Sequence, residues 1–265
     1  MRCFVELSYV GTAYHGWQRQ PQSISVQQML EEKLGQLLRA DGPITVVGCG
    51  RTDTGVHASQ FFAHFDCAVD FDAASDSTSD STTQSRLKFS SWEEAAWKLN
   101  GMLPVDIGIR RIWPVHEKAH ARYDAQERAY SYWVHLKKDP FLEGRSARVY
   151  HDLDVEAMNR AAAHLLGASD FKSFEKTGGG QKTSICDVRH AKWTVCADGR
   201  LRFDISADRF LRNMVRAIVG TLLEVGRGRM APDEMLDLIA SKNRSRAGTS
   251  AQACGLYLTS VEYAH

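Results

Sequence analysis

A carboxylate, an arginine and several glycines follow a short apolar run near residue 50 of this 265-residue chain. The run Ile44–Val47 leads into Gly-Cys-Gly-Arg-Thr-Asp-Thr-Gly-Val-His, residues 48–57. Arg51 precedes Asp53 by two residues, and a nearby guanidinium favours the ionised form of a carboxylate. An ionised carboxylate can act as a nucleophile or a base. The pattern indicates chemistry at Asp53, although Gly and Asp after a strand are also typical of an ordinary turn.

The glycine spacing excludes two phosphate-binding loops. A dinucleotide-binding Gly-x-Gly-x-x-Gly would need glycine at position 53, and a P-loop would need Gly-Lys-Ser/Thr. Asp53, His57 and His64 could bind the metal ion of a metal-dependent hydrolase, but no helical His-x-x-x-His and no second nearby carboxylate completes such a site. That hydrolase stays an alternative from a different class. We expect His57 to support the loop by hydrogen bonding and Cys49 to pack as a small apolar group.

The overall charge excludes a uniformly basic nucleic-acid binder. The chain carries 33 Lys and Arg against 32 Asp and Glu, which gives a formal net charge of +1 at pH 7. Basic residues outnumber acidic ones in residues 110–138 and 209–246, so two basic segments could line one cleft. The 43% hydrophobic and 25% charged residues are typical of a globular protein.

Cysteine spacing and hydropathy indicate a cytoplasmic protein. None of the 6 cysteines forms a Cys-x-x-Cys pair, which argues against zinc ribbons and thioredoxin-like redox motifs. No apolar run reaches membrane-spanning length. Residues 1–11 alternate like a strand and lack the apolar core of a signal peptide. We therefore expect reduced thiols and no membrane association.

The elements around Asp53 follow the order β-α-β-β-α-β. Residues 2–9 alternate between apolar and polar side chains, which predicts a strand with one buried face. Residues 25–40 predict a helix with one apolar stripe, and Ser25 with Gln28 forms a plausible capping box. Further elements are expected as strands at 44–48, 60–67 and 107–115 and a helix at 91–103.

A similar order recurs in the rest of the chain. The hairpin of residues 185–196 and 200–207 is predicted around Asp198-Gly199. Residues 154–167 predict a helix with an Asp cap and a terminal Gly. The other predicted elements are strands at 127–135 and 256–263 and helices at 209–226 and 232–241. Two such halves predict an α+β protein formed by duplication.

One segment interrupts this order. Residues 72–85 are rich in Ser, Thr and Asp and lack apolar periodicity. Such a segment cannot bury enough apolar surface to offset its chain entropy. We expect a flexible inserted loop within the first half.

Residues 50–58, Gly-Arg-Thr-Asp-Thr-Gly-Val-His-Ala, resemble the signature of the tRNA pseudouridine synthase A family. The family usually has Ala where this chain has Thr54. The resemblance covers essentially the whole chain except residues 67–90. Other blocks that resemble the family's, in the same order, are residues 9–21, 25–27, 99–112, 119–134, 170–174, 209–220 and 255–258.

The resemblance implies a reaction and a catalytic residue. The family isomerises uridine to pseudouridine at positions 38, 39 and 40 in the anticodon arm of tRNA, without a metal or an organic cofactor. The glycosidic N–C bond breaks, the uracil turns, and a new bond forms at C5. The family's essential aspartate matches Asp53, which would act as nucleophile or base. A non-catalytic tRNA-binding or RNA-folding protein on the same fold is the alternative.

The resemblance also implies substrate-binding residues. Arg51 matches the arginine associated with extruding the target nucleotide from the stem. Tyr130 matches the tyrosine that packs against the target uracil, because a flat ring can stack on a flipped base. Tyr132 has the same strand parity, so parity alone does not choose between the two tyrosines. Leu256 matches the apolar residue that lines the uracil pocket.

Arg216 matches the arginine that pairs with the catalytic aspartate. The helix predicted for residues 209–226 places Arg209, Arg212 and Arg216 on one face. Three arginines on one face repel one another unless anions lie nearby, and tRNA phosphates and a carboxylate are natural counter-charges. Without the family, a solvated basic face is the alternative. We expect Arg212 to contact a tRNA phosphate.

The resemblance implies an architecture and an assembly as well. Two pseudo-twofold-related α+β halves, residues 1–108 and 109–265, would form a mixed, mostly antiparallel sheet with helices outside and a basic central cleft. The first half carries the Asp53 loop and the second completes the active site. The family acts as a homodimer on tRNA.

Overall fold

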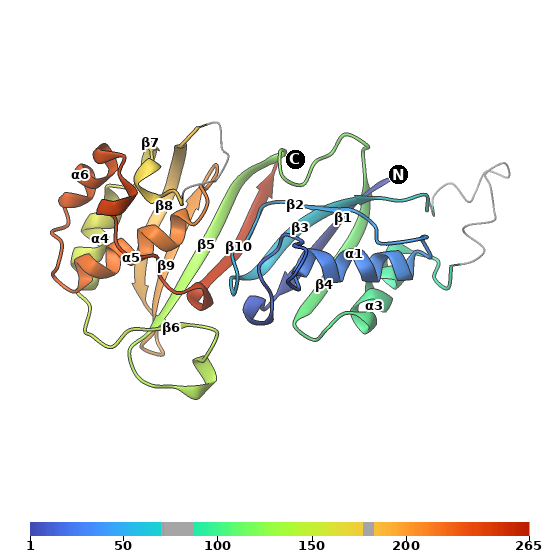
Figure 1. Cartoon of the computed structure of the whole chain (residues 1–265), viewed down its shortest axis with the longest axis horizontal. Helices are drawn as coiled ribbons and strands as arrows, with labels where there is room; N and C mark the ends of the chain where they lie inside the picture. Colours follow the sequence, from blue (N-terminus) through green and yellow to red (C-terminus); the bar gives the residue numbers. More distant parts are fainter. Residues whose placement is uncertain (70, 72–86, 177–182, 265) are drawn as a thin grey trace. The chain divides into compact units, whose positions relative to one another are not determined.

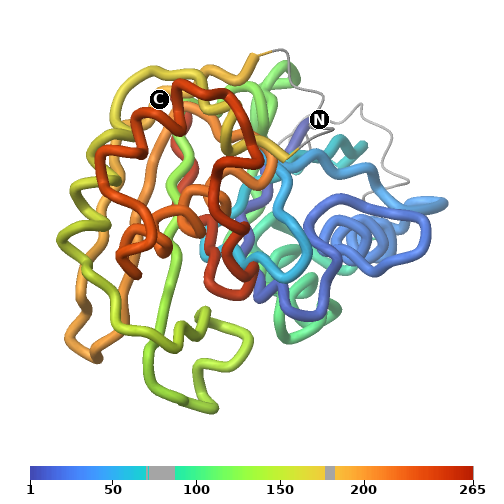
Figure 2. The backbone as a smooth tube through the Cα atoms, turned by 60° about the vertical axis from the view of Figure 1, so that its left-hand side comes forward, coloured from blue at the N-terminus to red at the C-terminus, as the bar shows by residue number. Residues whose placement is uncertain are grey.

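A computed structural model describes residues 1–69, 71, 87–176 and 183–264, and the chain divides into two compact units. Unit 1 comprises Met1–Ala125 with Tyr263–His265, and unit 2 comprises Gln126–Glu262. Figure 1 labels the elements, and the backbone of each unit can be followed in Figure 2. The predicted loop at residues 72–85 lies outside the described residues. The predicted duplication of residues 1–108 and 109–265 stays a prediction.

Unit 1 contains antiparallel strands with two helices packed beside them (Figure 1). Strand β1 lies between β4 and β3, and β2 pairs with β3. Helices α1 and α3 contact each other, and they contact β2 and β4 respectively. The bounds are β1 Arg2–Tyr9, η1 Gly11–Ala13, α1 Val26–Leu37, β2 Val46–Gly48, β3 His57–Asp66, α3 Trp92–Met102 and β4 Ile107–Val115.

Strand β1 is buried on both faces, so the predicted single buried face is wrong. Val5 and Leu7 are fully buried, but Phe4 and Glu6 on the other face are also only 6% exposed. Arg111 of β4 donates from Nε to the Glu6 carboxylate at 2.8 Å. Trp113 of β4 packs edge-on against Phe4. The neighbouring strand therefore supplies a counter-charge and a ring that the pattern of β1 alone does not contain.

Helix α1 forms as its pattern predicts, with one difference at its start. The Ser25 hydroxyl accepts a hydrogen bond from the backbone N–H of Gln28 at 3.3 Å, which caps the helix. The Gln28 amide group donates to Glu32 at 3.0 Å instead of returning to Ser25, so only half of the capping box forms. Leu30 and Leu34 of the predicted apolar stripe are fully buried.

Unit 2 contains a sheet in the order β10-β5-β9-β8-β7. The pairs β5–β9, β9–β8 and β8–β7 are antiparallel, and β6 pairs with β5 in parallel. The predicted hairpin is confirmed, with Gly199 in the left-handed region at φ 78°. The bounds are β5 Ala125–His135, β6 Ala147–Arg148, β7 Gly167–Asp170, β8 Ile185–Val195, β9 Leu201–Ala207 and β10 Leu256–Tyr263.

The helices of unit 2 lie against this sheet and against each other, with α4 in contact with both β8 and α5. Asp154 caps α4 by accepting from the Ala157 N–H at 2.8 Å, as predicted. The helix ends at Ala163, however, and Gly167 begins β7 instead of ending the helix. The bounds are η3 Pro140–Leu142, α4 Val155–Ala163, η4 Lys172–Phe174, α5 Met214–Gly226, α6 Glu234–Ser241, η5 Arg244–Arg246 and η6 Ala253–Gly255.

These elements confirm the predicted α+β class with mostly antiparallel pairing. The short strands β6 and β7 have no clear signal in the sequence, because two to four residues are too few for a period-2 pattern. Across the described residues, no helix combines the length and apolar character that crossing a lipid bilayer requires.

Candidate active site

Asp53 lies in the connection between β2 and β3 of unit 1, and its side chain is half-buried. Its backbone carbonyl accepts a hydrogen bond from the Val56 N–H at 3.1 Å. Gly55 adopts φ 77°, which a residue with a side chain rarely adopts. A tight turn therefore follows Asp53, so the turn interpretation of this motif is correct and is compatible with chemistry at its carboxylate.

Residues 11–17 hold this turn from the outside by backbone hydrogen bonds. The Trp17 N–H donates to the Thr52 carbonyl at 3.2 Å, and the Gly55 N–H donates to the Tyr14 carbonyl at 3.3 Å. The two bonds flank Asp53 on either side. A backbone fixed in this way gives a side chain a defined direction at little cost in entropy on binding.

Two glycines allow this close approach. A Cβ at Gly11 would lie 2.0 Å from the Val56 carbonyl oxygen, and a Cβ at Gly16 would lie 2.3 Å from the Thr52 carbonyl oxygen. Gly16 also has φ 83°. Any larger residue at these positions would push residues 11–17 away from the turn. The contact explains why glycines occur in the N-terminal block, which periodicity alone does not predict.

Buried polar side chains support the same turn. The Tyr9 hydroxyl lies 2.9 Å from the Thr52 hydroxyl. His57 is fully buried, and its Nδ1 accepts from the Gly11 N–H at 3.0 Å, which confirms the predicted supporting role. Cys49 is 1% exposed, in agreement with the predicted role as a small packed group.

Arg51 lies on the surface beside the turn. Its side chain is exposed, and among the described residues no ion pair joins it to Asp53. An exposed guanidinium next to a half-buried carboxylate is available to a ligand that approaches from solvent. Its predicted role in holding a flipped nucleotide stays a prediction.

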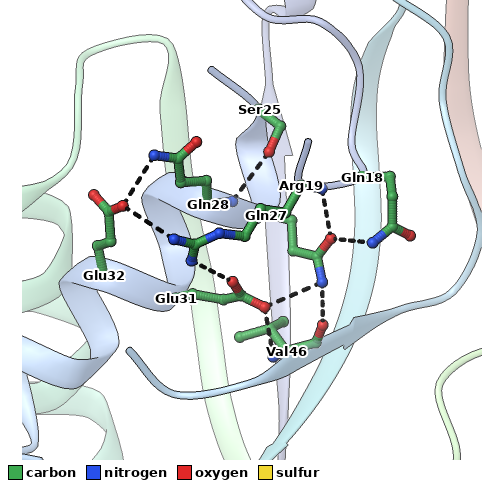
Figure 3. Close-up of polar contacts among 8 residues, drawn as sticks. All are labelled: Gln18, Arg19, Ser25, Gln27, Gln28, Glu31, Glu32 and Val46. Atoms are coloured by element: carbon green, nitrogen blue, oxygen red, sulfur yellow. Dashed lines mark hydrogen bonds and ion pairs between the residues drawn. The ribbon is translucent and has the colours of Figure 1, made fainter. Parts of the chain in front are cut away.

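A buried polar network fixes the start of the Asp53 loop (Figure 3). The Gln27 amide group donates to the Val46 carbonyl at 2.8 Å, and the Val46 N–H donates to Glu31 at 3.2 Å. Glu31 also accepts from Arg19 at 3.0 Å. Gln27 and Glu31 are 8% and 6% exposed although both are polar residues on a helix. This network ties α1 to β2, the strand that leads into the turn.

Sequence reasoning did not identify Gln27 and Glu31 as positioning residues. A glutamate at a helix position four residues after a glutamine is usually solvent-exposed. One signal in the sequence could have identified Gln27: residues 25–27 belong to a block that resembles the family, and the helical periodicity alone does not require that block. Only the tertiary structure shows that these two side chains satisfy the backbone of β2.

The alternative metal site on Asp53, His57 and His64 is not supported. His57 and His64 both belong to β3, seven residues apart, which corresponds to about 23 Å along a strand. His64 Nδ1 accepts from the Ala121 N–H at 3.1 Å, and burial lowers the pKa of His64 to about 4. Within the described residues, no group of three or more His, Cys, Asp or Glu side chains is placed to bind a metal ion.

In unit 2 the structure distinguishes the two tyrosines that share strand parity. Tyr132 is fully buried, and its hydroxyl donates to the Gln252 carbonyl at 2.8 Å. Burial raises the pKa of Tyr132. Tyr130 is half-buried and packs edge-on against Phe210 at a centroid distance of 5.1 Å. Tyr132 is therefore a structural residue, and only Tyr130 presents part of its ring to solvent.

Helix α5 begins later than predicted, which separates the three arginines. It starts at Met214, after Asn213 with φ 63°, so Arg209 and Arg212 precede the helix. The predicted shared helical face is wrong. The Asp208 carboxylate accepts from the Arg209 N–H at 2.7 Å, and the Arg212 carbonyl accepts from the Lys176 N–H at 3.0 Å. One local bond at Asp208 and one tertiary bond from Lys176 replace the first helical turn that the apolar spacing predicts.

Arg216 lies on the first turn of α5 and is held in place by a loop. Its Nε donates to the Ala251 carbonyl at 2.8 Å, while the Ala251 N–H donates to the Arg216 carbonyl at 2.9 Å. Gly220 and Gly248 allow the approach, because a Cβ at Gly220 would lie 1.8 Å from the Thr249 carbonyl oxygen. The guanidinium orientation is thus fixed by tertiary contacts.

The loop that holds Arg216 also leads to Leu256. Ala251 binds Arg216, and the next residue, Gln252, accepts the Tyr132 hydroxyl. Leu256 follows at the start of β10, beside β5, and is 6% exposed. Within unit 2, Tyr130, Arg216 and Leu256 therefore come from elements joined by residues 251–256. Arg212 is exposed on the turn before α5.

Comparison with protein families defines the class of protein. A family model described as tRNA pseudouridine synthase matches residues 161–264, which include Arg212, Arg216 and Leu256. This match covers the C-terminal part of the chain and indicates a tRNA pseudouridine synthase.

Relatives extend the match over the whole chain. The tRNA pseudouridine synthase A of Bacteroides fragilis is 45% identical over 265 residues, covering 99% of this chain and 96% of the relative. That of Porphyromonas gingivalis is 46% identical, covering 99% and 97%. That of Bacillus licheniformis is 37% identical, covering 99% of both. The chain therefore belongs to the tRNA pseudouridine synthase A family.

Proposed function

We propose that this protein isomerises uridine to pseudouridine at positions 38, 39 and 40 in the anticodon arm of tRNA, with Asp53 as the essential carboxylate. The observation that carries the proposal is the full-length match to the family together with a half-buried Asp53 on a turn fixed from both sides. A pure RNA-binding protein has no need for a carboxylate on a turn whose backbone is fixed in this way.

The chemistry needs an ionised carboxylate and a defined approach to the nucleotide. The glycosidic bond from C1′ to N1 breaks, and a new bond forms from C1′ to C5. The hydrogen on C5 leaves as a proton, and N1 gains a proton. The Asp53 carboxylate can serve as the nucleophile or base for this rearrangement. The proposal requires neither a metal nor an organic cofactor.

We assign the remaining predicted residues to substrate binding. Arg51 is proposed to hold the extruded nucleotide. Tyr130 offers a partly exposed ring for stacking against uracil, and Leu256 offers an apolar contact. Arg216 and Arg212 offer positive charge to a polyanionic ligand. The proposal includes a homodimer that acts on tRNA in the cytoplasm.

The decisive experiment measures tritium release from tRNA transcripts labelled at uracil C5. Wild type should release tritium, and Asp53→Ala should lower the rate at least about 100-fold, the low end of a general acid–base contribution. The control is Thr54→Ala, an exposed neighbour that the family usually has as Ala. Its rate should stay close to wild type.

Binding and position are measured in parallel. Asp53→Ala should bind tRNA with nearly the affinity of wild type, and a parallel loss of affinity would make Asp53 structural. Transcripts with cytidine at 38, 39 or 40 should each lose the release from that position. No release from wild type, with tRNA still bound, would favour the non-catalytic tRNA-binding protein.

A further inference from the structure

Unit 1 has an open cavity of about 710 Å³ at the C-terminal parts of its two helices. It lies among the C-terminal end of α1, residues 88–89 and the C-terminal half of α3. Its size falls within the range of small-ligand pockets, about 300–1,000 Å³. The lining that matters here combines two apolar side chains, one large aromatic ring and three cations: Leu37, Phe89, Trp97, Arg39, Lys88 and Lys98.

Trp97 forms an aromatic wall that packing does not explain. Helix α3 buries Trp92, Ala95 and Leu99, whereas Trp97 lies on another face and is 73% exposed. A single exposed apolar residue is ordinary on a protein surface. A ring that lines a cavity together with three cations is different, because aromatic faces and positive charge together match a nucleotide.

Arg39 stands where backbone geometry favours glycine. It follows the last turn of α1 with φ 52°, in the left-handed region that glycine adopts without strain. Positive charge near a helix C-terminus is favourable and explains a cation in this region. It does not explain why that cation occupies the strained position. A requirement for a guanidinium at the cavity edge explains both features.

The positive charge of the cavity is largely uncompensated by the described residues. Among the residues that the structure describes, no acidic residue lines it, and neither Arg39 nor Lys88 forms an ion pair with one of them. Lys98 pairs with Glu94 at 3.3 Å and lies 5.8 Å from the centre of the Trp97 ring. The cavity therefore presents cations and an aromatic face to whatever binds there.

We propose that this cavity binds one unpaired nucleotide of the tRNA substrate, with the base against Trp97 and the phosphate against Arg39 and Lys88. The choice of tRNA as the ligand of this cavity rests on the proposed function. A polyanionic substrate matches the charge of the cavity.

The cavity is remote from the Asp53 turn. The start of α1 is bound to Gly16, which lies against Thr52. The cavity lies at the other end of this 12-residue helix, which spans about 18 Å. Binding there contributes to tRNA affinity and leaves the chemical step unchanged.

Two substitutions test the aromatic and the cationic part separately. Trp97→Ala should raise the Kd for a tRNA transcript about five-fold or more, as loss of one stacked base does, with kcat within two-fold of wild type. Arg39→Gly removes the cation and relieves the backbone strain, so its melting temperature should equal or exceed that of wild type. Its slope of log Kd against log salt concentration should fall by about 0.7–0.9 in magnitude, the value of one phosphate contact.

Matched controls come from unit 2. Phe141→Ala removes a ring that is 90% exposed, and Arg160→Ala removes an exposed cation of α4. Both should leave Kd and the salt slope unchanged. Trp97→Phe should retain most of the affinity because it keeps a ring that can stack.

Three outcomes would overturn the proposal. The first is a folded Trp97→Ala variant with an unchanged Kd. The second is an unchanged salt slope for Arg39→Gly. The third is a lower sedimentation mass for Trp97→Ala, which would make this face a contact between protein chains. If Trp97→Ala binds tRNA more weakly than wild type does, but wild type releases no tritium, the proposed nucleotide site would stand and the proposed activity would be wrong.

Discussion

The Asp53 turn of unit 1 and the arginine segment of unit 2 position their side chains by different means. Asp53 follows a short strand, and local glycines with backbone hydrogen bonds from residues 11–17 fix its turn. Arg216 lies on a helix whose start is displaced from the predicted one, and its guanidinium is held by a loop 35 residues away. Both arrangements depend on partners distant in the chain, but the first also has glycines within a few residues of Asp53, and these leave a recognisable motif in the sequence.

The difference has a physical origin. Glycines at φ above zero and at close backbone contacts are required by sterics, so the residue types themselves mark the positions. A long side chain such as arginine can adopt many rotamers, and its direction is selected by whatever accepts its hydrogen bonds. Motif reasoning therefore locates Asp53 well and orients Arg212 and Arg216 poorly.

The largest effect should come from disrupting the close contact between Gly16 and Thr52, which fixes the turn. Gly16→Ala adds a Cβ at φ 83° and 2.3 Å from the Thr52 carbonyl oxygen, so it should destabilise unit 1 by about 3 kcal/mol or more. Activity should fall together with stability. Thermal unfolding with Gly42→Ala as the control, where an added Cβ meets nothing within 4 Å, measures this. Equal melting temperatures for both variants would show that residues 11–17 do not hold the turn.

The buried network beneath the turn should give the next largest effect. Glu31→Ala removes the acceptor of the buried Val46 N–H and one of the two acceptors of both Arg19 and Gln27, so we expect a loss of about 2–3 kcal/mol. Glu32→Ala is the matched control on the same helix. Its pair with Arg19 at 3.8 Å is partly exposed and should be worth less than about 1 kcal/mol. Denaturant unfolding of both variants gives the comparison, and similar losses would contradict the assigned network.

The far end of β3 should respond to pH. Burial lowers the pKa of His64 to about 4, below its unfolded value near 6.5, so the folded state favours the neutral ring. The unfolded chain binds more protons between these values, so the stabilisation is present above pH 6.5 and is lost as pH falls toward 4. Between pH 7.5 and 5 this loss should reach about 2 kcal/mol.

The variant His64→Asn isolates that contribution, because an amide oxygen can accept from the Ala121 N–H in place of Nδ1. Its stability should depend less on pH than that of wild type over the same interval. Two parallel profiles of unfolding free energy against pH would assign the acid sensitivity to other groups.

The smallest effect on the fold should come from the arginine segment. Arg212→Ala removes an exposed cation, so the melting temperature should stay within about 1 °C, since surface changes rarely exceed 0.5 kcal/mol. Binding to tRNA should weaken, and the salt slope should fall by about 0.7–0.9 in magnitude. Arg216→Ala loses its bond to Ala251 and should lower both stability and affinity. Equal changes in stability and in tRNA affinity for the two variants would contradict this difference and would favour one shared basic surface for Arg212 and Arg216.

Much of the fold follows from local patterns. Apolar spacing and caps located α1, α3, α4 and the β8–β9 hairpin, because helix and strand periods are set by the backbone itself. The predicted strands at 107–115 and 256–263 coincide with β4 and β10. For the candidate site, the string around Asp53 marked that residue as a candidate, and the resemblance to the family supplied its predicted role and added Tyr130.

The sequence by itself determined the family, through blocks that resemble those of its members. It also determined the α+β class and the position of the Asp53 turn, since glycine sterics and residue periodicity act over a few neighbouring residues. Only the tertiary structure decided that Tyr132 is buried and donates to the Gln252 carbonyl. It also decided that α5 starts at Met214 and that Gln27 and Glu31 are buried. Each of these outcomes depends on a hydrogen-bond partner or a covering strand far away in the chain. Local propensity cannot contain that information, because the energy that selects the arrangement arises from the distant contact.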